Sequence, residues 1–198
     1  MDELKMRKPL LFLPLCCLMA LAACRPGDEA SGACDLRVEI ALPGYTEVCL
    51  MTPEGCPTDT LQVDAEGRAI LTWPDTAVMP RLLLLHLENP ADSTDILNMP
   101  FVVEPGRVNV SIGRYIRTEG TPLNQRLQHF LDALQALHDE WAGRNDLSQA
   151  VKDAQASAFF SQQMLLNKDN PVGHYLYSRY ANRLNQEDRE RVKAEMSN

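Results

Sequence analysis

Residues 107–141 read RVNVSIGRYIRTEGTPLNQRLQHFLDALQALHDEW, and the spacing of the apolar residues changes within this stretch. In residues 107–112 apolar and polar residues alternate, which is typical of a half-buried β-strand. From Leu123 to Trp141 apolar residues return every three or four positions, which places them on one face of a helix. Because the residues before this stretch favour strands and those after it favour helices, the sequence predicts an α+β fold.

The first part of the predicted fold is a β-rich domain over residues 34–118. Cys34–Ile40 alternates apolar and charged residues, whereas Leu82–Leu85 is unbroken and apolar, as in a strand buried on both faces. Six or seven short strands are expected, over residues 34–40, 47–52, 61–63, 68–73, 81–88, 99–103 and 107–112. Hairpins are expected at Pro43-Gly44, residues 64–67 and residues 104–106. This pattern favours an N-terminal antiparallel β-sandwich or open barrel.

The second part is a small helical region over residues 119–198. Thr121 is a favourable N-cap, Pro122 fits the first helical position and Gly143 ends the first helix. A second helix is expected over residues 147–167. Its expected inward residues are Leu147, Val151, Ala154, Ala158 and Leu165. The later helices are expected to begin after the N-caps Asn170 and Asn185 and to end at Met196.

The N-terminus has the features of a bacterial export signal. Three basic residues precede a run of fifteen uncharged residues, which is shorter than the roughly 20 apolar residues of a spanning helix. The run ends in Leu21-Ala-Ala-Cys24, which resembles the lipobox of bacterial lipoproteins, where the cysteine is acylated. We therefore expect a signal peptide over residues 1–23, lipidation of Cys24 and a flexible tether over residues 24–33. The alternative is an ordinary signal cleavage site that happens to precede a cysteine.

Lipidation predicts the location of the protein, and its charge limits its partners. Two or more acyl chains hold a protein firmly on a membrane, so we expect a bacterial cell-envelope protein, on the outer rather than the inner membrane, facing the periplasm or the cell exterior.

The 198 residues include 19 basic and 27 acidic residues, a net charge of -8. An acidic chain argues against nucleic acid as a partner. No phosphate-loop, dinucleotide or metal-ligand motif occurs in the sequence, so no cofactor and no metal are expected.

Three cysteines follow the predicted lipidation site, namely Cys34, Cys49 and Cys56. Export would place them in an oxidising compartment, and they form no C-x-x-C pair. If Pro43-Gly44 turns the first hairpin, Cys34 and Cys56 lie near its open end. We therefore expect a Cys34–Cys56 disulfide and a buried Cys49 thiol.

Histidines and tyrosines are the other candidate site residues. His86 lies among leucines and is expected to be a hydrogen-bonded core residue. His129 and His138 are nine positions apart on one helix, whereas metal-binding pairs are four apart. The last helices carry three tyrosines, Tyr175, Tyr177 and Tyr180, whose spacing favours packing or solvation over a ligand groove.

Three short segments resemble a domain of unknown function in envelope lipoproteins of Gram-negative bacteria. They are the E-P-G turn within Phe101–Arg107, the G-T-x-x-N helix start within Glu119–Gln125 and the N-x-x-N-P-x-G link at Asn167–Gly173. In that family the domain usually precedes a thioredoxin-like module related to peroxiredoxins. The resemblance covers nearly all of residues 34–196 and implies an envelope partner with a thioredoxin-like fold. The C-x-x-C of that module does not occur in this sequence, which leaves a stand-alone domain or an interrupted longer protein as alternatives.

These observations predict a non-enzymatic lipoprotein module that binds or positions a partner. One alternative is an accessory of thiol–disulfide exchange that uses one of the cysteines of the exported chain. Another is a carrier of a small ligand. A reactive thiol is exposed and has a lowered pKa, whereas a structural thiol is buried and inert, so thiol titration separates the first two hypotheses.

Overall fold

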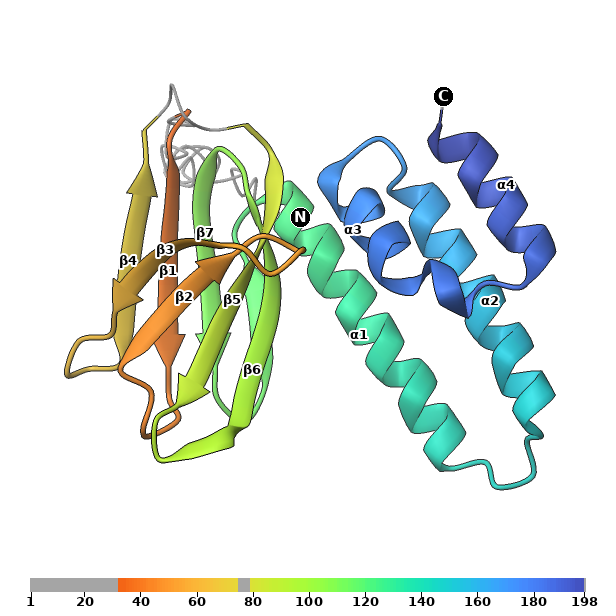
Figure 1. The fold of residues 1–198 in the computed structure, drawn as a ribbon, viewed down its shortest axis with the longest axis horizontal. Helices are drawn as coiled ribbons and strands as arrows, with labels where there is room; N and C mark the ends of the chain where they lie inside the picture. Colours follow the sequence, from red (N-terminus) through yellow and green to blue (C-terminus); the bar gives the residue numbers. More distant parts are fainter. Residues whose placement is uncertain (1–31, 75–78, 198) are drawn as a thin grey trace, which may run out of the picture. The chain divides into compact units, whose positions relative to one another are not determined.

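The computed structural model describes residues 32–74 and 79–197, except for the side chain of Ser93, and Figure 1 shows the fold. The predicted signal peptide, Cys24 and nearly all of the predicted tether lie outside the described residues. The described residues belong to one compact unit, residues 31–198. Strands occupy this unit up to Glu119 and helices begin at Pro122, which confirms the predicted α+β fold.

The strands are β1 (Cys34–Ile40), β2 (Glu47–Met51), β3 (Pro57–Gln62), β4 (Arg68–Trp73), β5 (Arg81–Asn89), β6 (Asp92–Val103), β7 (Gly106–Ile112) and β8 (Ile116–Glu119). The helices are α1 (Pro122–Ala142), α2 (Gln149–Leu166), α3 (Pro171–Tyr180), the short 3-10 helix η2 (Ala181–Arg183) and α4 (Gln186–Met196). None of these helices is long and apolar enough to cross a membrane.

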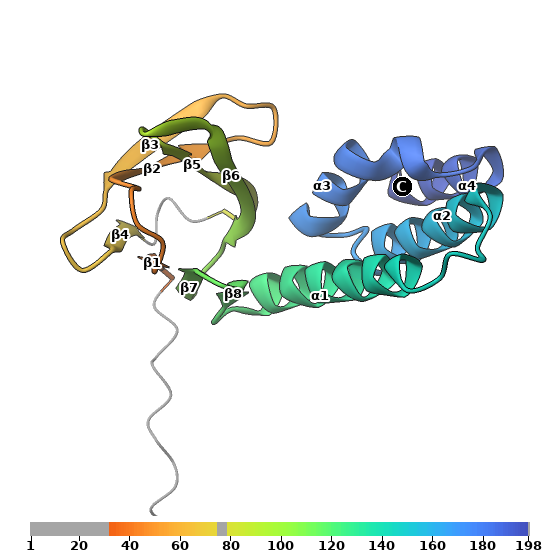
Figure 2. The same cartoon turned by 90° about the horizontal axis from the view of Figure 1, so that it is seen from below.

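The described strands form two four-stranded sheets. Sheet A has the order β4-β1-β7-β8, and sheet B has the order β3-β2-β5-β6. Neighbouring strands are antiparallel except β1 and β7, which are parallel. The two sheets face each other across a common hydrophobic core, as Figure 2 shows. This part of the chain is therefore a β-sandwich, one of the two architectures that the sequence favours.

The predicted hairpins are wrong, although the chain turns where the sequence places the turns. β1 pairs with β4 and β7, whereas β2 pairs with β3 and β5, so the chain crosses between the sheets after Pro43-Gly44. Residues 64–67 and 104–106 also join strands of different sheets. An alternating pattern fixes which residues face the core but leaves the partner strand open. At these three turns the strands before and after the turn belong to opposite sheets and do not pair with each other.

The core between the sheets consists of inward residues from both. The alternation predicted for β1 is confirmed, because Leu36 and Val38 are buried and the residues that follow each of them are exposed. β5 is buried on both faces only at its start, where Leu82 and Leu83 are both buried, whereas further along its outer face His86 is half-buried and Glu88 is exposed. Leu83 and Leu85 belong to the core of the sandwich, whereas Leu82 packs with the helices in a second core.

The predicted starts of α1, α3 and α4 are confirmed, α2 begins at Gln149 and not at residue 147, and the predicted inward face of α2 is wrong. Pro122 begins α1, and the side chains of Asn170 and Asn185 cap α3 and α4. The buried residues of α2 are Ala156, Ser157, Phe160, Ser161 and Met164. Of the residues predicted to face inward, Val151, Ala154 and Ala158 are exposed, and Leu147 and Leu165 are half-buried.

Candidate functional site

Two of the segments that carry the family resemblance meet at the start of α1. Oε1 of the buried Glu104 accepts hydrogen bonds from the backbone N–H groups of Leu123 (2.7 Å) and Asn124 (3.1 Å). The first N–H groups of a helix have no partner within the helix, and a negative charge there interacts favourably with the helix dipole. Thr121 stands at the predicted N-cap position, but its side chain makes no capping hydrogen bond. The capping acceptor comes from Glu104 instead.

Two amide side chains of α1 bind the edges of the two sheets. Asn124 accepts from the backbone N–H of Val102 at 2.8 Å and donates to the Val102 carbonyl at 2.7 Å, as a neighbouring strand would. One turn later, Gln128 accepts from the backbone N–H of Thr118 at 2.8 Å. Val102 lies in β6 and Thr118 in β8, which are edge strands of sheets B and A. Both amides are buried, so they act as structural links between α1 and the sandwich.

The third segment of the resemblance, Asn167–Gly173, is the junction between α2 and α3. Asn167 donates from Nδ2 to the carbonyl of Gln163 at 2.9 Å, and Asn170 caps α3 by accepting from the N–H of Val172 at 3.0 Å. The carbonyl of Asn167 lies so close to Gly173 that a Cβ atom at position 173 would clash with it. These residues form a compact helix junction.

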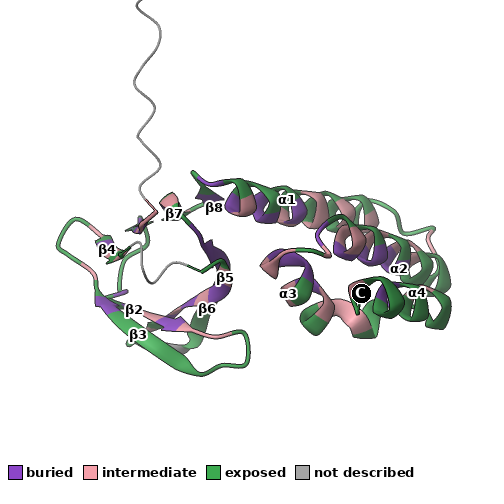
Figure 3. Cartoon of the chain, turned by 90° about the horizontal axis from the view of Figure 1, so that it is seen from above, coloured by how far each residue is buried: buried purple, intermediate pink, exposed green. Residues whose placement is uncertain are grey.

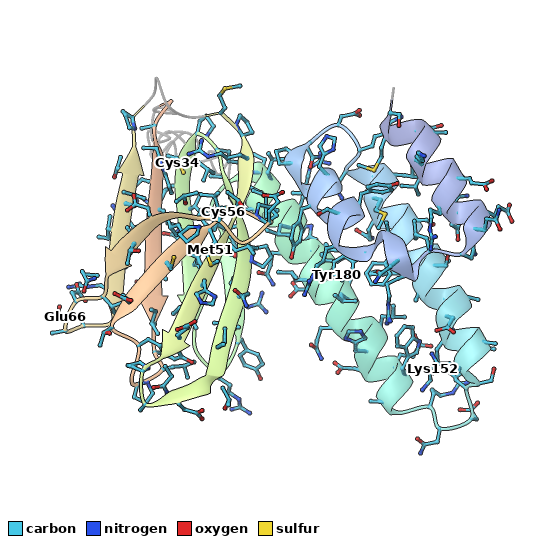
Figure 4. The ribbon with its side chains drawn as sticks, in the orientation of Figure 1. Cys34, Met51, Cys56, Glu66, Lys152 and Tyr180 are labelled. Carbon is cyan, nitrogen blue, oxygen red and sulfur yellow. The ribbon has the colours of Figure 1, made fainter. Side chains whose placement is uncertain are left out.

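The three described cysteines are free thiols, so the predicted Cys34–Cys56 disulfide is not formed. Cys34 lies on β1 of sheet A between Trp73 and Gly106, while Cys56 is exposed in the turn that precedes β3 of sheet B (Figure 4). The hairpin from which the bridge was deduced does not exist. Burial raises the pKa of the Cys34 thiol, as expected for an inert structural cysteine. Cys49 is half-buried and not buried as predicted.

Cys49 belongs to a polar row on the outer face of sheet B. The strand register places Thr60, Cys49, His86 and Asn98 side by side on four neighbouring strands. His86 Nδ1 lies 2.8 Å from Asn98 Oδ1 and Nε2 lies 3.0 Å from Glu88 Oε1. These hydrogen bonds, above all the one to Asn98, raise the pKa of His86. His86 is thus hydrogen-bonded as predicted, but it lies on the outer face and not in the core.

A thiol beside an imidazole can form a nucleophile–base pair when the two groups are hydrogen-bonded. In this structure both ring nitrogens of His86 face other partners. Cys49 Sγ contacts a backbone carbonyl of its own strand at 3.8 Å. The row therefore brings a half-exposed thiol next to an oriented imidazole without the hydrogen bond of a catalytic pair.

The remaining candidate residues of the sequence are dispersed or packed. Tyr180 stacks on Phe160 with ring centroids 4.6 Å apart, and burial raises the pKa of Tyr175 to about 12. Tyr175 also lines a shallow cleft of about 310 Å³ between α3 and the β2–β3 turn. His129 and His138 are exposed on α1. Within residues 32–74 and 79–197, no group of three or more His, Cys, Asp and Glu side chains could hold a metal ion.

Three α2 residues that the sequence predicts to face inward lie on the outside of the helix. Together with the exposed Leu166 they form a surface that we call the outward stripe, which consists of Val151, Ala154, Ala158 and Leu166. Leu165, also predicted to face inward, is half-buried and packs against the helical core. Val151 and Leu166 are 43% and 61% exposed, which is unusual for large apolar side chains on a helix that already has a buried face. The neighbouring α4 is exposed along most of its length (Figure 3).

Two hollows accompany the outward stripe along the side of α2 that faces α4. One, of about 580 Å³, lies between residues 150–156 and the segment 182–185. The other, of about 550 Å³, lies between residues 158–166 and the α4 residues Asp188 and Arg191. Apolar helix faces beside grooves are a common mode of recognition between proteins.

Comparison with known proteins gives no relative. No family model, no curated protein and no solved structure matches this chain.

Proposed function

We propose that this chain is a lipid-anchored, non-enzymatic module of the bacterial cell envelope that binds or positions a partner protein. The observation that carries the binding role is the outward stripe of α2, because a helix that is apolar on both sides is normally covered on both. The lipobox-like Leu21–Cys24 segment supports the anchoring.

The contacts of the family segments also favour binding over catalysis. Glu104 and Asn124 are buried polar residues of the kind that often belong to active sites. Glu104 accepts hydrogen bonds from backbone N–H groups at the start of α1, and Asn124 binds the backbone of Val102 and donates to the Thr121 hydroxyl. These bonds explain why such residue types occur in the segments without any need for a reaction.

The anchoring is tested by labelling cells with a fatty-acid probe. We expect the wild type to be labelled and Cys24→Ala to be unlabelled, because Cys24 would be the acylated residue. Cys17→Ala is the matched control, since Cys17 lies within the predicted signal peptide and should leave labelling intact. Equal labelling of the Cys24→Ala protein and the wild type contradicts the proposed anchor.

The binding role is tested by photo-crosslinking from the outward stripe. A photoreactive residue at position 158 should capture a protein in envelope membranes, and one at the exposed position 136 of α1 should not. No capture from position 158 contradicts the proposed binding surface.

A second candidate function is an accessory role in thiol–disulfide exchange. It is favoured by the register of Cys49 beside His86 and by the exposure of Cys56. The partner implied by the family resemblance is an envelope protein with a thioredoxin-like fold. Mixed disulfides trapped in the envelope by wild type and lost in a Cys49→Ser, Cys56→Ser double variant would favour this candidate.

A third candidate function is the carrying of a small ligand, which would bind in the cleft beside Tyr175. The cleft is shallow, so this alternative has less support.

A further inference from the structure

We propose that His86 is a pH-sensitive clasp on the outer face of sheet B. In its doubly protonated form it holds the turn end of the β5–β6 hairpin, and it loosens its hold when the ring loses a proton. The inference goes beyond the proposed function, because the clasp belongs neither to the outward stripe nor to the lipobox-like segment. Three observations carry it: the two partners of the ring, its surroundings and its place on the hairpin.

The first observation is that both ring nitrogens of His86 face oxygen atoms. Nδ1 lies 2.8 Å from Oδ1 of Asn98, and Nε2 lies 3.0 Å from Oε1 of Glu88. An amide oxygen and an ionised carboxylate both accept hydrogen bonds and donate none. A neutral imidazole has one N–H and satisfies one of these oxygens, whereas the imidazolium donates to both. The arrangement therefore fits the protonated ring.

The second observation is the set of groups that face the ring from the neighbouring strands. Cys49 of β2 stands opposite His86 and donates its S–H to a backbone carbonyl of its own strand, and the acidic Glu47 lies two residues away on the same face. On its other side, β6 presents the uncharged Asn98. A positive charge on His86 is thus surrounded by an acceptor and by acids.

The balance of these interactions favours the charged ring. The His86 side chain is 20% exposed, so its hydrogen bonds are screened less than those of a fully exposed ion pair. The hydrogen bond to Asn98 raises the pKa of His86, partial burial opposes this, and the hydrogen bond and charge of Glu88 raise the pKa further.

The third observation is the place of His86 on the hairpin. β5 and β6 pair in regular register as far as Glu88, and the register shifts between Glu88 and Asn89. Such an irregularity interrupts the backbone hydrogen bonds between two strands. His86 opposite Asn98 lies two residues before it, and residues 90–92 and 94–95 beyond it are exposed. The side-chain bonds of His86 therefore hold the strands together where their backbone pairing ends.

The direction of the pH effect follows from the binding of a proton on folding. A histidine of the unfolded chain has a pKa of about 6.5, and the folded pKa of His86 is higher. The contribution of the clasp to stability is therefore complete below about pH 6.5 and is lost as the pH rises through the folded pKa. The hairpin is held more firmly in acid.

An NMR titration of the purified full-length chain tests the protonation of the ring. The chain has four histidines, and the imidazole signal that disappears in His86→Gln belongs to His86. We expect the midpoint of this signal above about pH 6.5. A midpoint at or below that value overturns the proposal.

Replacement of Asn98 tests which amide atom faces the ring. Because the oxygen accepts from Nδ1, Asn98→Leu should lower the His86 midpoint and Asn98→Asp should raise it. Asn109→Leu, at an exposed asparagine of sheet A, is the matched control and should leave the midpoint unchanged. An amide nitrogen in this position would donate to the neutral ring, so a raised midpoint in Asn98→Leu contradicts the clasp.

Unfolding in urea tests whether the clasp stabilises the fold. Glu88→Gln keeps an acceptor and removes the charge, so its loss of stability relative to wild type should be larger below the His86 midpoint than above it. Glu39→Gln is the matched control, since Glu39 is an exposed strand residue of sheet A, and its effect should be equal on both sides of the midpoint. An effect of Glu88→Gln that is the same on both sides contradicts a pH-sensitive clasp.

Hydrogen exchange tests where the clasp acts. At one pH below the midpoint, the backbone amides of residues 88–97 should exchange faster in Glu88→Gln than in wild type, because local opening of the hairpin end becomes easier. The amides of β1 and β7 in sheet A should exchange alike in the two proteins. Equal exchange of residues 88–97 in both proteins overturns the proposal.

Discussion

The side-chain amide of Asn124 accepts a hydrogen bond from the N–H of Val102 and donates one to its carbonyl. A neighbouring strand in a sheet forms the same pair of hydrogen bonds through its backbone. The sequence predicts the helix around Asn124 correctly, but its polar character suggests an exposed residue. A sequence pattern records that a residue is polar and leaves open which backbone group it binds. The interior position of Asn124 follows only when β6 and α1 are placed side by side.

Replacing Asn124 tests how much its hydrogen bonds to Val102 contribute to the free energy of unfolding. Asn124→Ala leaves the N–H and the carbonyl of Val102 buried and unpaired, and each such group costs about 1–3 kcal/mol. We expect a corresponding loss in the free energy of unfolding, measured with urea. Gln125→Ala is the control, because Gln125 is the exposed neighbour on the same helix and its loss should change little. Equal midpoints for the two variants contradict the structural role of Asn124.

At the scale of elements, α2 shows why the sequence predicts a helix correctly and its inward face wrongly. Apolar residues lie on both of its sides, and periodicity alone does not distinguish the two. The buried side also contains Ser157, which donates to Asp188 of α4 and accepts from the N–H of Asn185 at 2.9 Å. These bonds satisfy the hydroxyl of Ser157 and so allow a serine on the buried side of α2.

At the α2–α3 junction we expect a glycine-to-alanine substitution to destabilise the fold, although this substitution usually stabilises a helix. Alanine is ordinarily more favourable than glycine inside a helix by about 0.8–1.0 kcal/mol. At position 173, however, a Cβ atom would clash with the carbonyl of Asn167, so Gly173→Ala should lower the melting temperature. Gly143→Ala is the control, since a Cβ atom at position 143 would make only ordinary contacts and should not destabilise the fold. A stabilised Gly173→Ala variant contradicts the close packing of this junction.

At the scale of the whole molecule, the order of strands is the part of the fold that the sequence does not determine. The bounds of β1 and β4 and the starts of three helices follow from local patterns and caps, and they are correct. Which strands become neighbours depends on contacts between distant residues, such as the parallel pairing of Cys34–Ile40 with Gly106–Ile112. The same limitation explains the disulfide that was expected and the Cys49–His86 neighbourhood that was not.

Because α1 is hydrogen-bonded to both sheets, we expect sandwich and helices to unfold together. The chain has two tryptophans, Trp73 on β4 and Trp141 on α1, so Trp141→Phe reports on the sandwich and Trp73→Phe on the helices. For each variant, the fluorescence midpoint in urea should match its own circular dichroism midpoint, as in two-state unfolding. Fluorescence and dichroism transitions that separate would show that the two parts unfold independently.

The attachment of α1 also bears on how the protein tolerates crowding. An edge strand with free N–H and C=O groups is a template for strand addition from another molecule, and it can begin aggregation. Side chains of the protein's own helix bind the N–H and the C=O of Val102 in β6 and the N–H of Thr118 in β8. On the membrane to which we propose the chain is anchored, neighbouring molecules are thereby hindered from joining sheet to sheet at these positions.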